Sequence, residues 1–235
     1  MLAVTVYLAV AFIFTTVLSV GLFGWAARWS GRVLGLLVGW GLVQGGVALS
    51  GFYTNTAGLP PRLALLLGPA LVVIGILMAT AAGRRFLGGL RLEVLTLLHV
   101  VRLPVELVLL GLYRHGAVPQ LMTFEGRNWD VLAGLSAPLV YYFAFRQRRL
   151  GRRGLLLWNG LGLVSLLNIV GNAVLSVPSP LQRFGFEQPN VAILHFPFVW
   201  LPCVVVPLVL LAHLAAIGRL WAGPEAVSGK LEDRQ

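Results

Sequence analysis

Long apolar blocks, separated by short polar or basic segments, dominate the chain from its first residues to about residue 221. A helix that spans a bilayer needs about 20 mostly apolar residues. Blocks of about this length recur along the chain, so the pattern predicts an all-α integral membrane bundle of about seven transmembrane helices. The expected spans are Leu2–Trp25, Val33–Tyr53, Leu63–Ala82, Leu92–Tyr113, Trp129–Phe145, Gly154–Ser176 and Ala192–Trp221.

The segments between the blocks are too short to hold a soluble domain. We therefore expect residues 1–222 to form one transmembrane domain and residues 223–235 to form a short polar cytoplasmic tail. The first block has no basic residues before it and is longer than the apolar core of a signal peptide, so we interpret it as the first span.

Basic residues are distributed unevenly among the connections. Of the 18 Lys and Arg residues, 13 fall in the first, third and fifth connections and in the C-terminal segment, and 4 fall in the other connections. Cytoplasmic loops carry the excess of Lys and Arg in membrane proteins. This asymmetry predicts that the N-terminus lies outside and the C-terminus lies in the cytoplasm.

The composition changes this picture little. Only 11% of the residues are charged and 58% are hydrophobic, although the net charge is +10. The basic residues flank apolar blocks and form no polar helix face, so we expect membrane lipids as partners and no nucleic acid. Cys203 is the only cysteine, which excludes an internal disulfide and indicates a small buried side chain.

Three ionisable residues interrupt the fourth expected span, namely His99, Arg102 and Glu106. Steps of three and four residues place them on one helix face. Insertion scales assign about 2.5–3.5 kcal/mol to a charged side chain at the centre of a span, so this face must point into the bundle or a wet cavity. We expect an Arg102–Glu106 ion pair, which would either serve a ligand or lock helices together.

Other polar residues fall mostly in the outer half of the expected bundle. The sixth span carries amides at helical spacing, the fifth begins with a carboxylate, and His195 lies near the outer end of the seventh. These positions predict a cavity that opens outward and receives a small polar ligand. The candidate ligand-binding residues are His99, Arg102, Glu106, Asn168, Asn172, His195, Glu125 and Asp130.

A small transporter or ligand-binding protein is the function that these features favour. In size and topology the chain is similar to the SWEET sugar transporters, although Pro119-Gln120 falls in an outer loop and their proline-glutamine signature is missing from the first helix of each repeat. The segment His99–Trp221 is also similar to bacterial multi-pass proteins of unassigned function. The expected location is therefore a bacterial cytoplasmic membrane.

A membrane-embedded lipid-modifying enzyme is an alternative, in one form a metal-dependent hydrolase similar to the ceramidase-like family. Its ligands would come from His99, His195 and His213 with Asp130 or Glu106. However, His195 and His213 are separated by about 27 Å on an ideal helix, so one metal ion cannot bind both. We assign no metal site.

Two further alternatives are a haem-binding electron carrier and a sensor. The fourth and seventh spans run antiparallel, which places His99 and His213 at matched depths, as a haem site with two histidine ligands requires. A retinal-binding sensor needs a lysine in the bundle, whereas the only lysine, Lys230, falls in the tail. The sequence identifies neither a cofactor nor a reaction.

Overall fold

The computed structural model describes residues 6–58 and 60–222, and within these ranges every regular element is helical. The expected cytoplasmic tail, residues 223–235, lies outside the described residues, as do residues 1–5 at the start of the first expected span. The main helices are α1 (Val6–Ala26), α2 (Gly31–Leu49), α3 (Ala64–Ala79), α4 (Ala81–Gly89), α5 (Leu92–Leu98), α6 (Arg102–Arg114), α7 (Asp130–Tyr141), α8 (Arg152–Leu175) and α9 (Val206–Trp221).

Short 3₁₀ and π segments extend or join these helices. The 3₁₀ turn η2 (His99–Val101) connects α5 to α6, and the π segment η6 (Leu201–Val205) continues into α9. The π segment η4 (Tyr142–Arg146) extends α7. The remaining 3₁₀ turns lie in connections: η1 (Phe52–Thr54), η3 (Gln120–Met122) and η5 (Ala192–Leu194).

Five helices are long and apolar enough to cross a membrane, which agrees with a membrane protein. They are Val6–Ala26, Gly31–Leu49, Leu92–Arg114, Arg152–Leu175 and Leu201–Trp221. The bent pair formed by α3 and α4 is a sixth candidate.

The third expected span bends sharply at its end. The axes of α3 and α4 differ by 94°, and Thr80 lies at the bend in an extended conformation. Its side chain accepts a hydrogen bond from the backbone N–H of Gly83 at 3.1 Å, which caps the start of α4. The apolar block Leu63–Ala82 therefore ends as a helix three residues earlier than its composition predicts.

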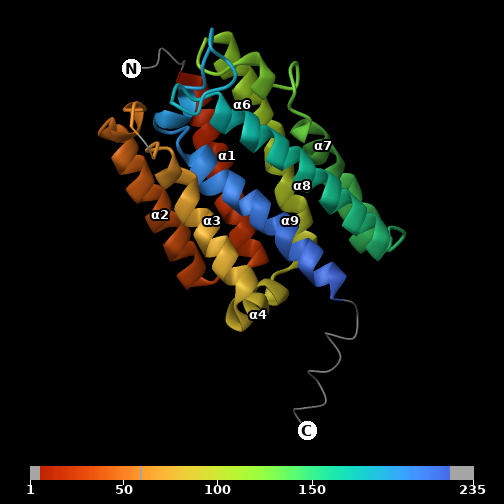
Figure 1. Cartoon of the computed structure of the whole chain (residues 1–235). Helices are drawn as coiled ribbons and strands as arrows, with labels where there is room; N and C mark the ends of the chain where they lie inside the picture. The colour runs from red at the N-terminus through yellow and green to blue at the C-terminus, as the bar shows by residue number, and fades with distance from the viewer. Residues whose placement is uncertain (1–5, 59, 223–235) are drawn as a thin grey trace.

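The helices pack around α9, which lies in the middle of the bundle with α8 as its most extensive neighbour (Figure 1). α1 packs against α5 and α6, while α7 contacts α5, α6 and α8. In Figure 1, α2 and α3 lie on one side of α9, and α7 and α8 lie on the other. Polar side chains on α6, α7, α8 and α9 can therefore meet inside the bundle.

Two long connections, residues 115–129 and 176–200, pack together at one end of the bundle (Figure 1). The backbone N–H groups of Val191 and Ala192 donate to the Ala117 carbonyl at 3.1 and 3.0 Å. The Gln188 side chain donates to the Val118 carbonyl at 2.6 Å. Ala117 and Val118 are fully buried, so these connections form an ordered cap on the helices.

The continuous helix of the seventh expected span begins at Leu201, and η5 forms a separate 3₁₀ turn before it. Pro197 has no N–H group and disfavours the helical conformation of the residue before it, so Ala192–Trp200 does not extend the helix. Pro207 likewise cannot donate to the Cys203 carbonyl four residues earlier. The indole N–H of Trp40 on α2 binds that carbonyl at 2.9 Å, and this bond attaches α2 to the centre of the bundle.

Candidate functional site

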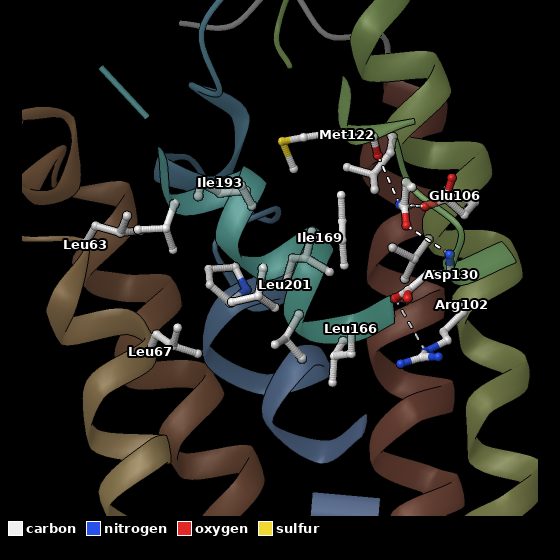
Figure 2. A pocket seen from close by; sticks show the side chains of 18 residues that line it. Leu63, Leu67, Arg102, Glu106, Met122, Asp130, Leu166, Ile169, Ile193 and Leu201 are labelled. Carbon is white, nitrogen blue, oxygen red and sulfur yellow. Dashed lines mark hydrogen bonds and ion pairs between the residues drawn. The ribbon is translucent and has the colours of Figure 1, made fainter. Parts of the chain in front are cut away.

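A cavity of about 80 Å³ lies between α3, α6, α8 and the helix formed by η6 and α9 (Figure 2). Most of its wall is apolar, with Leu67 from α3, Ile169 from α8 and Leu201 from η6. One part of the wall is different because charged and amide side chains form it. These residues are Arg102, Glu106, Asn128 and Asp130, here called the polar wall.

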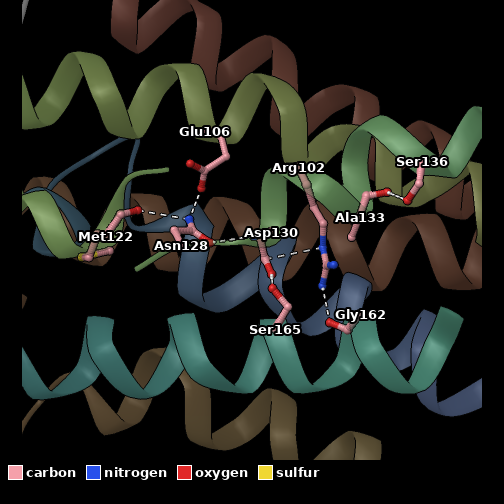
Figure 3. A network of polar contacts seen from close by, with 9 residues as sticks. All are labelled: Arg102, Glu106, Met122, Asn128, Asp130, Ala133, Ser136, Gly162 and Ser165. Carbon is pink, nitrogen blue, oxygen red and sulfur yellow. Dashed lines mark hydrogen bonds and ion pairs between the residues drawn. The ribbon is translucent and has the colours of Figure 1, made fainter. Parts of the chain in front are cut away.

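Arg102 and Asp130 form an ion pair in the polar wall. Arg102 Nε lies 3.5 Å from Asp130 Oδ2, and the two residues are only 3% and 6% exposed. Arg102 Nη2 also donates to the Gly162 carbonyl at 3.2 Å, and Asp130 accepts from the Ser165 hydroxyl at 2.6 Å (Figure 3). The pair therefore connects α6 with α7 and α8.

The expected Arg102–Glu106 ion pair is wrong. Within residues 6–58 and 60–222, the ion pair of Arg102 is with Asp130. Side chains on a helix lean toward its N-terminus, so the Arg102 side chain leans away from Glu106, which follows it by four residues. An i,i+4 pair is also weaker when the basic residue comes first. Asp130 is nearer because α7 begins beside this face of α6.

Glu106 has a neutral partner in place of an arginine. Its Oε1 accepts a hydrogen bond from Asn128 Nδ2, which also donates to the Met122 carbonyl at 3.1 Å (Figure 3). Asn128 Oδ1 accepts from the backbone N–H of Asp130 at 3.1 Å, so the orientation of the amide is fixed. Glu106 is 1% exposed, and its Oε2 makes no hydrogen bond to the described part of the chain.

A second polar cluster, here called the lower cluster, lies farther from the cap than the polar wall and contains His99, His213 and Asn159. The two imidazole rings stack with centroids 3.9 Å apart and planes inclined by 23°, and both histidines are buried. His213 Nδ1 lies 3.0 Å from Asn159 Oδ1, while Asn159 Nδ2 donates to the Leu155 carbonyl at 2.9 Å. That second bond orients the amide, so His213 donates from Nδ1 and its Nε2 remains an acceptor in the neutral ring.

Gly162 on α8 connects the two polar clusters. A Cβ atom at this position would lie 2.6 Å from His213 Cε1, 2.9 Å from His213 Nε2 and 3.6 Å from Arg102 Nη1. A larger residue would therefore clash with the imidazole ring. Neither His213 Nε2 nor Arg102 Nη1 has a hydrogen-bond partner among the described residues.

The eight residues expected to bind a ligand are not all in one place. Arg102, Glu106 and Asp130 line the cavity, and His99 lies in the lower cluster. The other four, Asn168, Asn172, His195 and Glu125, are outside the residues that line it.

Asn168 and Asn172 have other contacts. Asn168 is exposed and donates to the Arg127 carbonyl at 2.9 Å, and Asn172 donates to Asn168 Oδ1 at 3.4 Å. His195 is half-buried and Glu125 is exposed. Helical spacing places the two amides on the same face of α8 as Ser165. They lie about one and two turns farther along the helix, where Asn168 contacts the connection 115–129 and not the polar wall.

Asn128 is the polar-wall residue that the sequence candidates omit. Its position directly before the fifth span, two residues before Asp130, is the signal that could have identified it. In the structure it lies near the end of the connection 115–129 and is 2% exposed.

The buried histidines do not form a site with metal-binding geometry. Metal ligation requires the lone pairs of ring nitrogens to point at the ion, at about 2.0–2.1 Å for zinc, whereas His99 and His213 face each other with their ring planes. The described residues contain no group of three or more His, Cys, Asp or Glu side chains that could hold a metal ion. This geometry gives no support to the enzyme with a bound metal or to the haem carrier.

Comparison with known proteins identifies a family. A family model described as a domain of unknown function (DUF8737) matches residues 59–221. The matched segment covers more than half of the chain and includes the polar wall, the lower cluster and every helix around the cavity. No curated protein and no solved structure matches the chain.

Proposed function

The chain belongs to the DUF8737 family, and we propose that it is a small membrane transporter or ligand-binding protein whose ligand occupies the cavity between α3, α6, α8 and α9. The observation that carries this proposal is a buried polar wall on an otherwise apolar cavity. Such a surface is complementary to a small amphipathic molecule, whose polar end meets the charged side chains and whose apolar body contacts the aliphatic ones.

The cost of burying the polar wall supports a role in binding. Arg102, Asp130 and Glu106 are ionisable and buried, and all three lie on helices rich in apolar residues. Aliphatic residues of similar volume often stabilise a core as well as or better than a buried ion pair. Ionisable groups inside membrane segments are rare, and they typically mark substrate or ion pathways.

The proposed membrane arrangement has seven spans, with the N-terminus outside and the C-terminus in the cytoplasm of a bacterial cell. In this arrangement α3 is the third span, and α7 together with η4 is the fifth. The distribution of Lys and Arg supports this sidedness. The cavity then lies in the outer half of the bundle, because the polar wall adjoins the connection 115–129 on the outer side.

Equilibrium binding to the purified protein in lipid nanodiscs tests the ligand site. The probes are octylamine, octanoate and octanol, which share an eight-carbon body and differ in charge. Val170 lines the cavity on α8, whereas Val164 on the same helix is 66% exposed. We expect Val170→Phe to weaken binding of the preferred probe at least tenfold and Val164→Phe to leave it unchanged. Equal binding to both variants would contradict the proposal.

A further inference from the structure

We infer that the ligand of this cavity carries a primary or secondary ammonium group on an aliphatic body, and that Glu106 recognises the ammonium group. This inference rests on the proposed ligand site and names the chemical class of its ligand. Three observations carry it: the charges of the polar wall, the open hydrogen-bonding capacity of Glu106 and the residue types that line the rest of the cavity.

The polar wall holds two acidic residues and one basic residue. Arg102 is paired with Asp130, and Nη2 of its guanidinium is also held by the Gly162 carbonyl. The side-chain partner of Glu106 is the neutral amide of Asn128. An ionised Glu106 is therefore a surplus negative charge in a buried position, and such a charge is costly unless a cation or a proton compensates it.

The hydrogen-bonding groups of Glu106 indicate which kind of cation fits. Oε1 accepts from Asn128, and the backbone N–H of Phe124 also lies near the carboxylate, but Oε2 accepts no hydrogen bond from the described chain. An ammonium group with N–H donors can satisfy this oxygen by a charge-assisted hydrogen bond. A carboxylate ligand would instead place a further negative charge beside Glu106 and Asp130, and a neutral alcohol would leave the charge of Glu106 uncompensated.

The remaining lining residues exclude another common way of binding a cation. Quaternary ammonium groups are recognised by the faces of aromatic rings, and no aromatic side chain is among the residues that line this cavity in the described structure. The walls that face the polar wall are aliphatic, with Ile169 and Val170 on α8 and Leu201 on η6. This surface fits the alkyl chain of a ligand, and it lacks the aromatic cage that binds a methylated ammonium group.

Binding to four probes that share an eight-carbon chain, measured in nanodiscs, tests the inference: octylamine as its ammonium form, octyltrimethylammonium, octanoate and octanol. We expect octylammonium to bind at least tenfold more tightly than each of the other three. Glu106→Gln, which keeps the size of the side chain, should lower octylammonium affinity at least tenfold and remove its preference over octanol. Glu106→Asp retains a carboxylate and should keep the preference for octylammonium over octanol. The matched control is Glu187→Gln, because Glu187 is exposed in the connection 176–200, and this variant should bind all four probes as the natural chain does.

The outcomes separate this inference from the proposed function. If Val170→Phe blocks the probes but octylammonium has no advantage, or keeps its advantage in Glu106→Gln, the cavity is a ligand site and the inference is overturned. A preference for octanoate or for octyltrimethylammonium also overturns it. If Val170→Phe changes the binding of none of the probes, the proposed function itself fails. Octanol binding by Glu106→Gln reports whether the cavity is intact, and Glu106→Asp provides an independent variant.

Discussion

The guanidinium group of Arg102 lies 3.5 Å from the carboxylate of Asp130, across the interface between α6 and α7, and not against Glu106 one turn along its own helix. This pairing has two consequences. It connects three helices through Asp130, Ser165 and the Gly162 carbonyl. It also leaves Glu106 with a neutral partner, which is the basis of the inferred specificity for an ammonium ligand.

Breaking this pair should destabilise the protein strongly. Removing one partner of a buried ion pair typically costs about 3–5 kcal/mol, because the other charge stays buried without compensation. We therefore expect Arg102→Met to lower the free energy of unfolding by about this amount. The measurement is equilibrium unfolding in detergent micelles with a chemical denaturant.

The double variant Arg102→Met/Asp130→Leu provides the control for that prediction. It removes both charges and replaces them with apolar groups of comparable length, so it should recover most of the lost stability. If the double variant is as unstable as the sum of the two single variants, the ion pair does not couple the two positions in the way the structure indicates.

Gly162 should tolerate no side chain. A Cβ atom there would lie 2.6 Å from His213 Cε1, so Gly162→Ala must displace the ring or separate α8 from α9. Overpacking of this kind costs about 1–3 kcal/mol. Gly160, two residues earlier on α8, has open space where a Cβ atom would lie, with no neighbouring atom within 4 Å, and Gly160→Ala should be neutral or stabilising. Thermal unfolding of the two variants compares them directly, and equal melting temperatures would contradict the close approach at Gly162.

The Asn159–His213 hydrogen bond should be measurable as a coupling energy. Asn159→Leu leaves the buried Nδ1–H of His213 without an acceptor, which costs about 1–3 kcal/mol. His213→Leu removes the donor, so adding Asn159→Leu to that variant should cost less than it does alone. The double-mutant cycle should give an interaction energy of about 0.5–3 kcal/mol. An interaction energy near zero would contradict the bond and the assigned ring tautomer.

The sequence predicts the helical elements better than it predicts their partners. Apolar blocks locate the helices because bilayer thickness and helix geometry set their length. The antiparallel run of the fourth and seventh expected spans predicts matched depths for His99 and His213, and the structure brings their rings into contact. By contrast, helical spacing says only that Arg102 and Glu106 share a face. Which residue Arg102 binds depends on where α7 begins relative to α6. The spacing of residues along one helix contains no information about this arrangement of two helices.

The cavity itself follows from features that periodicity does not encode. Pro197 delays the start of the continuous helix of the seventh expected span to Leu201, and the π segment η6 at its start contributes Leu201 and Pro202 to the cavity wall. Asn168 and Asn172, in contrast, were expected to bind the ligand but do not line the cavity. Their spacing places them on the same face of α8 as Ser165, but they lie about one and two turns farther along the helix, where Asn168 contacts the connection 115–129.

The proposed sidedness can be tested with single cysteines in a Cys203→Ser background, since the natural cysteine is 2% exposed and its removal leaves no other thiol. Glu125 and Gln147 are both exposed, and they lie in connections at opposite ends of the bundle. The reagent is a membrane-impermeant maleimide, added to bacterial cells whose outer membrane has been made permeable and whose inner membrane is closed. We expect Glu125→Cys to react under these conditions. Gln147→Cys should react only when the inner membrane is also opened, because its connection carries five arginines and is therefore expected on the cytoplasmic side. Labelling of Gln147→Cys alone in cells with a closed inner membrane would reverse the orientation, and labelling of both sites would contradict an odd number of crossings between them.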